Sequence, residues 1–214
     1  MTEPHTHRLA ELSVADFCEL LATGQATPGG GSAAALTAAL ASALVAMVAR
    51  LTAGRRSYAD HKAEMQELIV AADALRARLV DLIDADARAY ADVMRAYQMP
   101  RHTPSQQARR TGALQTALRN ATDLPLEAAE LCLQTLELAV AVATRGNPNA
   151  AGDAAVAALL AHAALQSQAR NALGNLAAIT APHYCSRVTR RSAEITAAGE
   201  VALRRALAAG EGRG

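Results

Sequence analysis

Apolar residues recur every three or four positions along most of the chain, and no stretch alternates strictly between apolar and polar. This period is typical of α-helices that bury one face. Breaks rich in glycine, proline and asparagine divide the pattern. It predicts an all-α fold, a single-domain bundle of six to seven helices with a long central pair. We expect helices over residues 14–21, 32–52, 58–97, 105–120, 123–144, 150–179 and 182–209.

Local signals support several of these boundaries. Ser13 and Ser32 are good N-cap residues, and Pro125 suits the first turn of a helix. No linker separates two domains within the 214 residues. We therefore expect a flexible N-terminus over residues 1–12, one helical domain over residues 13–209 and a flexible tail over residues 210–214.

The segment 33–49 carries no charged residue and consists mostly of alanine. It reaches the lower length limit for a membrane span. Alanine is a weak lipid partner, however, and a buried central helix is the favoured interpretation. Because aromatic residues make up only 2% of the chain, the core must rely on closely packed small side chains. Such helices are natural neighbours in a tight bundle or at a subunit contact.

The composition argues against several classes of partner and site. The 21 basic and 20 acidic residues nearly balance, which gives no reason to expect a nucleic-acid partner. Three scattered cysteines without a Cys-X-X-Cys pair, and a polar N-terminus without a signal-peptide pattern, suit a cytoplasmic protein. The six histidines show no metal-binding spacing, so we expect no metal site.

The run Thr27-Pro28-Gly29-Gly30-Gly31-Ser32 stands directly before the alanine-rich helix. Three glycines allow other atoms to approach the backbone closely. The free N–H groups of a helix start favour anions and carbonyl oxygens. The run is therefore either a tight turn between touching helices or part of a binding site. Its spacing matches neither a P-loop nor a dinucleotide-binding motif.

A stripe along residues 75–97 contains one carboxylate, Asp86, among Leu, Val and Tyr side chains. Two positions correspond to about 200° of helix rotation, so Asp84 and Asp86 should not both face inward. Asp86 is the one on the apolar stripe, so we expect Asp86 to face inward. Burial of a carboxyl group raises its pKa, which suits a general acid or base. The alternative is a structural aspartate bonded to a neighbouring helix.

Further candidates allow both a structural and a functional interpretation. Asp153 follows the Asn147-Pro148-Asn149 break and either stabilises a helix start or lines a cleft. Asn171 and Asn175 share its helix face, which indicates either a polar pocket or interhelical hydrogen bonds. Basic or aromatic residues near breaks are either solvated or bind an anionic or flat ligand. These residues are Arg55, Arg56, Tyr58, Arg101, His102, Arg109 and Arg110.

Taken together, these motifs resemble the cyclodeaminase/cyclohydrolase family of tetrahydrofolate enzymes. The resemblance covers roughly residues 10–205 in seven ordered blocks. The blocks are residues 27–32, 47–52, 54–58, 83–90, 99–103, 124–126 and 146–149, with Asp153. Two departures stand out: Arg101 occupies a position where the family often has lysine, and Gly152 one where it often has serine. Arginine does not release a proton near neutral pH, so it cannot replace a lysine acid.

The resemblance implies an all-helical homodimer with Asp86 as the catalytic residue and a folate-type substrate, without a metal or other cofactor. It also implies substrate contacts from the glycine run, the two asparagines, Asp153 and the basic residues. The expected substrate-binding residues are Pro28, Gly29, Gly30, Gly31, Ser32, Arg55, Arg56, Tyr58, Arg101, Asn147, Asn149 and Asp153.

The expected reaction is hydrolysis of 5,10-methenyltetrahydrofolate to 10-formyltetrahydrofolate. One alternative is the cyclodeaminase reaction, in which formiminotetrahydrofolate closes to the methenyl form and releases ammonia. A second alternative is a non-catalytic helical dimer that binds folate or a protein partner.

Overall fold

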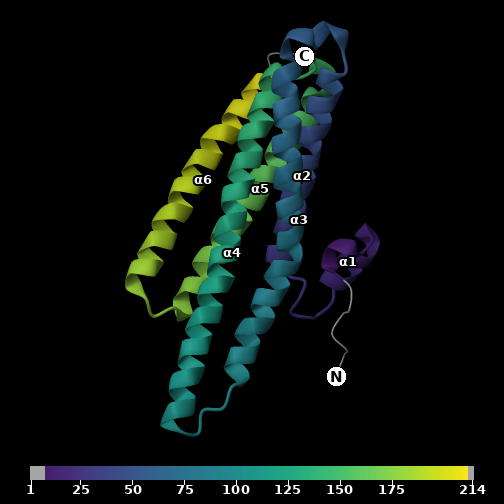
Figure 1. Ribbon diagram of the computed structural model, residues 1–214. Helices are drawn as coiled ribbons and strands as arrows, with labels where there is room; N and C mark the ends of the chain where they lie inside the picture. The colour runs from purple at the N-terminus through teal and green to yellow at the C-terminus, as the bar shows by residue number, and fades with distance from the viewer. Residues whose placement is uncertain (1–7, 212–214) are drawn as a thin grey trace.

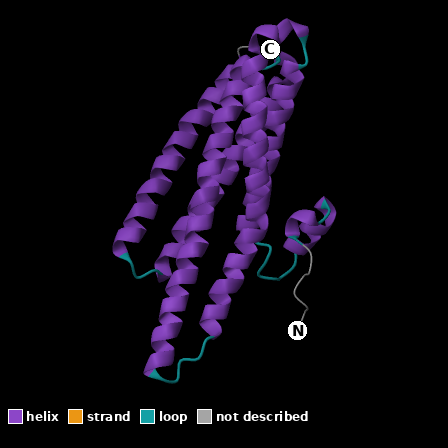
Figure 2. Cartoon of the chain, in the orientation of Figure 1, coloured by secondary structure: helices purple, strands orange, loops and turns teal. Residues whose placement is uncertain are grey.

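Six α-helices account for most of residues 8–211, the part of the chain that the computed structural model describes (Figure 1). They are α1 (Val14–Leu21), α2 (Gly30–Ala53), α3 (Lys62–Gln98), α4 (Pro104–Arg145), α5 (Ala151–Gly174) and α6 (Pro182–Glu211). Short 3₁₀ turns lie at Leu9–Glu11, Arg56–His61, Pro148–Ala150 and Asn175–Ala178. Within the described residues no strand occurs (Figure 2), which confirms the all-α prediction.

Consecutive long helices run up and down beside each other, so α2, α3, α4, α5 and α6 form an elongated bundle (Figure 1). The two longest helices, α3 and α4, form a hairpin whose tip extends below the other helices in that view. The loop between them ends in a capping box: Thr103 accepts from the Gln106 N–H, and the Gln106 side chain accepts from the Thr103 N–H. This cap fixes the start of α4.

Helix α2 lies in the core, as the alanine-rich segment predicts. Thirteen of its 24 residues are buried, and most of these are alanines. It is the one helix in the described part of the chain that is long and apolar enough to cross a membrane, yet 61% of its most apolar window is buried in the bundle. Small side chains let α3 and α5 approach α2 closely.

The prediction of two helices over residues 105–120 and 123–144 is wrong, because α4 continues through Pro125. Proline lacks an N–H, so the carbonyl of Ala121 four positions earlier loses its helical partner. The Asn175 side chain replaces that partner by donating a hydrogen bond of 2.7 Å to the Ala121 oxygen. A contact from the far end of α5 therefore allows the helix to remain unbroken.

The expected flexible ends are only partly described. Residues 1–7 and 212–214 lie outside the described residues. Residues 8–12, which we expected to be flexible as well, instead contact α3: the Leu9 N–H donates to Asp84 at 2.6 Å, and Arg8 pairs with Asp84 and Asp81. Helix α1 has its expected bounds, and Ser13 caps it by accepting from the Asp16 N–H.

Candidate active site

Helix α2 begins at the glycine run, and its first turn lies against Asp86 of α3. The helix starts at Gly30 with Gly29 as the N-cap, so the prediction of Ser32 as N-cap is wrong. Ser32 is instead fully buried in the first turn, and its hydroxyl contacts the Ile83 carbonyl at 2.9 Å and an Asp86 carboxyl oxygen at 3.1 Å. The carboxyl group thus lies at the positive end of α2.

Gly31 is required for this approach of the two helices. A Cβ atom built at Gly31 would overlap the Asp86 carboxyl group, with all three carboxyl atoms inside contact distance. Gln168 of α5 holds the same turn from the other side, since its amide donates to the Gly31 carbonyl at 3.0 Å. The glycine run therefore permits a close contact between a helix start and a carboxylate.

Burial raises the pKa of Asp86 above its usual value of 3.8. Hydrogen bonds from the Ser32 side chain and backbone oppose this rise by favouring the ionised form. Asp86 is only partly buried, so one side of the group is accessible. A carboxyl group with these properties accepts and returns protons more readily near neutrality than an exposed aspartate does.

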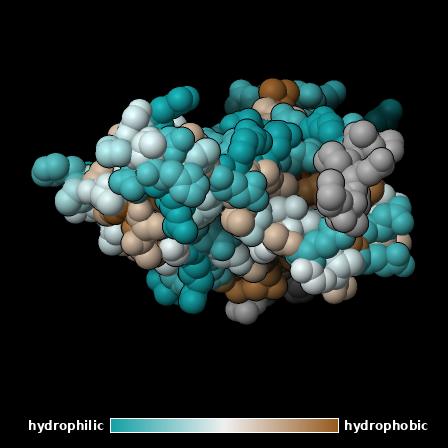
Figure 3. Space-filling model, turned by 90° about the horizontal axis from the view of Figure 1, so that it is seen from below, coloured by the Kyte–Doolittle hydropathy of each residue, from teal (hydrophilic) through white to brown (hydrophobic). Residues whose placement is uncertain are grey.

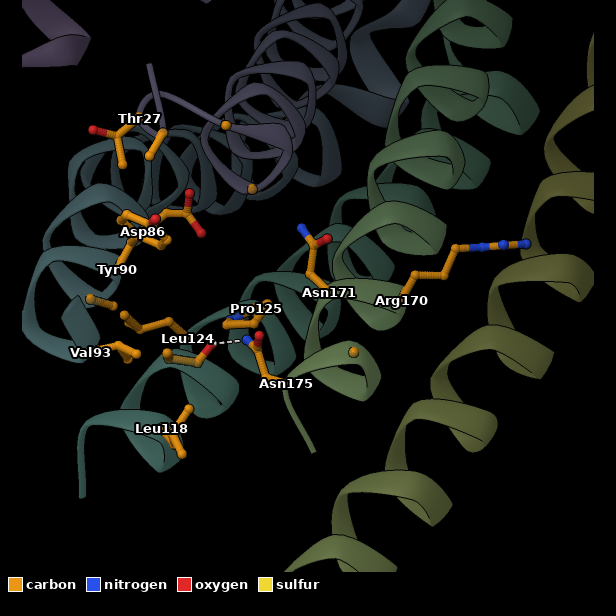
Figure 4. Close-up of a pocket in the computed structure, with 16 residues that line it drawn as sticks. Thr27, Asp86, Tyr90, Val93, Leu118, Leu124, Pro125, Arg170, Asn171 and Asn175 are labelled. Atoms are coloured by element: carbon orange, nitrogen blue, oxygen red, sulfur yellow. Dashed lines mark hydrogen bonds between the residues drawn. The ribbon is translucent and has the colours of Figure 1, made fainter. Parts of the chain in front are cut away.

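This accessible side opens into a cleft of about 420 Å³ between α2, α3, α4 and α5 (Figure 4). The walls combine backbone from the glycine run with apolar and aromatic side chains and two amides. The lining residues are Ala26, Thr27, Gly29, Gly31, Asp86, Ala89, Tyr90, Val93, Leu118, Ala121, Leu124, Pro125, Arg170, Asn171, Gly174 and Asn175. A few polar groups in a largely apolar concavity are typical of small-molecule sites.

The amides of this cleft come from Asn171 and Asn175. Asn171 points toward the interior of the cleft in Figure 4, whereas Arg170 extends away toward α6. Asn175 is occupied by its bond to Ala121. Their spacing of four residues on an otherwise apolar helix indicated a possible pocket, but nothing in the sequence showed that Asp86 faces the same space.

Several predicted binding residues lie at the opposite end of the bundle. Asn147 is buried beside the C-terminal end of α2, where its N–H donates to the Thr52 hydroxyl at 2.9 Å. Thr52 is 21 residues from Gly31, or about 30 Å along the helix axis. The structure therefore does not bring this group together with Asp86 within one protomer. The group consists of Arg55, Arg56, Tyr58, Asn147, Asn149 and Asp153.

Asn147 and Asn149 have a local role instead. The Asn147 side chain accepts from the Asn149 N–H at 3.1 Å and caps the turn that leads into α5. The expectation that these residues share one cleft with Asp86 is therefore wrong for a single protomer. Arg101 is also outside the cleft, exposed at the tip of the α3–α4 hairpin. Pro28 is buried and Gly30 exposed, and neither lines the cleft.

Asp84 is the acidic residue whose position the sequence interpretation missed. It is 6% exposed and lies on the other side of α3 from the cleft, bonded to Arg8 and to the Leu9 N–H. Asp84 is thus buried on one side of α3, and Asp86 faces the cleft on the other. The helix stripe could not reveal this, because the N-terminal segment supplies a second covering surface.

The described residues contain no group of three or more His, Cys, Asp and Glu side chains that could hold a metal ion. The three cysteines, Cys18, Cys132 and Cys185, are free. The chemistry of the cleft in the described part of the chain therefore centres on one carboxyl group, its serine partner and nearby amides.

Both the sequence and the fold match known proteins. The family model described as formiminotransferase-cyclodeaminase matches residues 13–194. A methenyltetrahydrofolate cyclohydrolase from Methylorubrum extorquens is 39% identical over 163 residues, which cover 76% of this chain and 78% of that protein. A formimidoyltransferase-cyclodeaminase from Rattus norvegicus is 41% identical over 150 residues, covering 70% of this chain but only 28% of the rat protein.

Among solved structures, a formiminotetrahydrofolate cyclodeaminase from Thermotoga maritima superposes with a TM-score of 0.87 at 31% identity. The match covers 96% of this chain and 98% of the other. The chain thus shares the all-helical fold of this solved structure. The chain belongs to the formiminotransferase-cyclodeaminase family.

Proposed function

We propose that the protein hydrolyses the one-carbon bridge of 5,10-methenyltetrahydrofolate to give 10-formyltetrahydrofolate. The single observation that carries this proposal is the partly buried Asp86 carboxyl group, facing a cleft able to hold a flat ligand. The cyclohydrolase of Methylorubrum extorquens supports it, because the similarity extends over 78% of that protein.

In the proposed reaction the Asp86 carboxylate lies beside the cationic N–C–N bridge and stabilises its positive charge. Water adds to the bridge carbon, and its proton passes to the carboxylate. The tetrahedral carbon then carries a hydroxyl group and is bonded to both N5 and N10. The bond to N5 breaks as N5 receives a proton and the hydroxyl oxygen becomes the formyl oxygen. General acid–base catalysis of this kind typically contributes about 10²–10⁴-fold.

Ser32 and Gly31 support this role without contacting the reacting carbon. The Ser32 hydroxyl, buried against the Ile83 carbonyl, holds one Asp86 oxygen, while the accessible side of the carboxyl group faces the cleft. The proposed conversion leaves the oxidation level of the carbon unchanged and moves only protons and water. We therefore propose that it requires no redox cofactor and no metal.

The cyclodeaminase reaction is the second candidate, favoured by the closely similar Thermotoga maritima structure. In that direction N10 attacks the formimino carbon on N5, Asp86 takes the N10 proton, and ammonia leaves after it is protonated. Both reactions pass through a tetrahedral carbon that bridges N5 and N10, so one carboxyl group serves either.

Two parallel measurements with purified protein separate these candidates. The first follows the absorbance loss of methenyltetrahydrofolate against its spontaneous hydrolysis, and the second follows ammonia release from formiminotetrahydrofolate. Faster loss in the first supports the cyclohydrolase, and release in the second supports the cyclodeaminase. If neither is accelerated, the enzymatic proposal is wrong, and retained folate binding would support the non-catalytic alternative.

We also propose that the protein is a homodimer through the outer faces of α2 and α5. These faces expose large apolar side chains, namely Leu40 (53%), Met47 (36%), Leu51 (48%), Val156 (46%) and Leu159 (49%). The two helices are neighbours, as the bond between Gln168 and Gly31 shows. A two-fold axis places such a face against its own copy, and the uncharged segment 33–49 avoids like-charge contacts there.

Sedimentation measurements test the dimer. We expect wild-type protein at twice its chain mass of 22.2 kDa, and Leu40→Glu at the monomer mass. Val70→Glu is the matched control, because Val70 is an equally apolar, 62% exposed residue on α3 outside this face. A monomeric wild type, or an equal effect of the two substitutions on the sedimenting mass, would contradict the proposed dimer.

The substrate is a metabolite of the cytoplasm in this proposal, and the protein is expected there without a membrane or nucleic-acid partner. The burial of α2 supports this expectation. Recovery of the protein in the supernatant after lysis without detergent tests it, and recovery in the membrane pellet would contradict it.

A further inference from the structure

The Ser32 hydroxyl group lies between two oxygen atoms of α3 but carries a single hydrogen. Its oxygen is 2.9 Å from the Ile83 carbonyl oxygen and 3.1 Å from the Oδ2 atom of Asp86. A hydroxyl group donates one hydrogen bond and accepts up to two others. Ser32 therefore donates to either Ile83 or Asp86 at a given moment. Of these two, only Asp86 can in turn donate to Ser32.

When Asp86 is ionised, the Ser32 hydroxyl group donates to the carboxylate. Hydrogen bonds to a charged acceptor are stronger than those to a neutral carbonyl. This bond is also one of the two from Ser32 that oppose the effect of burial on the pKa of Asp86. The Ile83 carbonyl keeps a partner, because α3 is continuous there and the Ala87 N–H donates to it four positions later. The ionised state therefore leaves neither oxygen without a hydrogen bond.

When Asp86 is protonated, its O–H needs an acceptor, and the Ser32 oxygen provides one. The Ser32 hydrogen then points to the Ile83 carbonyl at 2.9 Å. Each of the three groups again has a partner. By rotating about its C–O bond, one hydroxyl group thus serves both the base form and the acid form of Asp86, without movement of either helix.

The Ser32 hydroxyl group is shielded from water, so a solvent molecule does not replace it. The end of the molecule that carries the hairpin tip is mostly hydrophilic at its surface (Figure 3), but Ser32, in the first turn of α2, has no exposed surface. Gly31 brings this turn into contact with the carboxyl group, and the Gln168 amide of α5 holds the Gly31 carbonyl. The hydroxyl and carboxyl groups are therefore held in one relative position.

Apart from Ser32, no side chain in the described part of the chain bonds to Asp86. Among the other titratable residues that line the cleft, α3 contributes Tyr90 and α5 contributes Arg170, while α2 and α4 contribute none. Tyr90 is 43% exposed, and Arg170 extends away toward α6 (Figure 4). Ser32 is therefore the side chain that responds directly to the proton on Asp86.

We propose that Ser32 is a positioning residue that reverses its hydrogen bond to Asp86 in each catalytic cycle. It donates to the carboxylate that takes up a proton, and it accepts from the carboxylic acid that returns the proton. This inference rests on the proposed function, in which Asp86 gains and loses a proton in every turnover. It gives the serine of the glycine run a part in proton transfer, which neither an N-cap nor a substrate contact would have.

The experiment compares wild type with Ser32→Ala and Ser42→Ala. Ser42 is the matched control, because it is also fully buried on α2 and its hydroxyl donates to an α3 carbonyl, that of Ala72, at 2.7 Å. Carbon-13 NMR follows the Asp86 carboxyl and Ile83 carbonyl signals as pH changes, and Asp86→Asn identifies the carboxyl signal. In wild type the Ile83 signal should shift at the pH where Asp86 titrates, because the hydroxyl group turns away from that carbonyl.

In Ser32→Ala the shift of the Ile83 signal should become smaller. The Asp86 carboxyl group should titrate at higher pH, since a bond that favours its ionised form is lost. We expect kcat to fall about two- to tenfold, the range of one hydrogen bond, with KM unchanged. Ser42→Ala should leave both titrations and kcat as in wild type. Ser32→Cys is a second test should Ser32→Ala fail to fold, because a thiol keeps the shape but forms only weak hydrogen bonds.

An Ile83 shift of equal size in wild type and Ser32→Ala, or an unchanged titration of Asp86, overturns the proposal. An equal effect of Ser32→Ala and Ser42→Ala on the titration of Asp86 overturns it as well. The NMR titration needs no substrate. Absence of turnover in wild type, together with coupled titration of Asp86 and Ile83, would therefore contradict the proposed function and leave the hydrogen-bond reversal itself in place.

Discussion

Asp84 and Asp86 lie two positions apart on α3, and their hydrogen bonds attach the two ends of one chain segment, residues 9–32, to that helix. Asp84 accepts from the Leu9 N–H at 2.6 Å, and Asp86 contacts the Ser32 hydroxyl at 3.1 Å on the other side of the helix. Between these two attachments the chain forms α1 and the loop that supplies Ala26, Thr27 and Gly29 to the cleft. One turn of α3 therefore fixes both the carboxyl group of the cleft and the wall beside it.

The first prediction concerns Asp86 itself. Asp86→Asn preserves the shape and the contact with Ser32 but cannot take up a proton, so kcat should fall about 10²–10⁴-fold while substrate affinity changes little. Steady-state kinetics and equilibrium folate binding measure the two effects. Asp92→Asn, on the solvent side of the same helix, is the control and should retain activity. Equal turnover in Asp86→Asn and wild type would exclude Asp86 as the proton acceptor.

A second prediction follows from the raised pKa of Asp86. Because the carboxylate form is the active base, the rate should decline as pH falls through a pKa that lies above 3.8. Between 3.8 and this raised pKa the folded state binds more protons than the unfolded state, so rising pH lowers the free energy of unfolding. Asp86→Asn lacks this effect.

Melting curves of both proteins at several pH values test this second prediction. The melting temperature of Asp86→Asn should gain on that of wild type as pH rises through the same window, and the gain should persist above it. A difference between the two melting temperatures that stays constant across the series, or a melting temperature of Asp86→Asn that falls relative to wild type as pH rises, would be inconsistent with a desolvated carboxyl group.

Gly31 provides the third prediction. In Gly31→Ala the added methyl group overlaps the Asp86 carboxyl group, so α2 and α3 must separate. We expect a loss of about 1–3 kcal/mol in the free energy of unfolding, together with a strong loss of activity. Gly112→Ala is the control, since a Cβ there meets nothing within 4 Å and alanine favours the helix. Chemical denaturation of both variants measures these changes. An unchanged free energy of unfolding in Gly31→Ala would disprove the close contact.

The fourth prediction concerns the unbroken helix α4. Asn175→Ala removes the donor to the Ala121 carbonyl and should cost about 1–3 kcal/mol, because that carbonyl cannot bond to Pro125. In a Pro125→Ala background the alanine N–H supplies the missing bond, so the same Asn175→Ala change should cost less. A double-mutant cycle by denaturant unfolding measures this coupling. Additive effects would show that Asn175 does not compensate for the proline.

The fifth prediction tests the attachment at Asp84. Asp84→Ala leaves the Leu9 N–H without its acceptor and should cost about 1–3 kcal/mol, with faster amide exchange at Leu9. Asp81→Ala removes only an exposed pair with Arg8 and should cost less than about 1 kcal/mol. Because the attached segment carries one wall of the cleft, Asp84→Ala should also raise KM. Unchanged exchange at Leu9 would contradict the attachment.

The sequence by itself determined the helical fold and placed Asp86 on the face of α3 that packs toward α2, because both depend on the helical period of 3.6 residues. It also marked the glycine run, since glycines before an alanine helix allow the close approach that the structure shows at Gly31. These signals are local, because the spacing of apolar residues along one helix can be read without knowing which helix it packs against.

Only the tertiary structure decided which residues share a space. The helix break predicted before Pro125 failed because Asn175, fifty residues later, replaces the lost bond. Asp84 became buried because the N-terminal segment covers it. Asn147 and Arg55 lie far from Asp86 because a helix of 24 residues keeps its two ends apart. Each outcome depends on contacts between distant segments, which the spacing of residues along one helix does not encode.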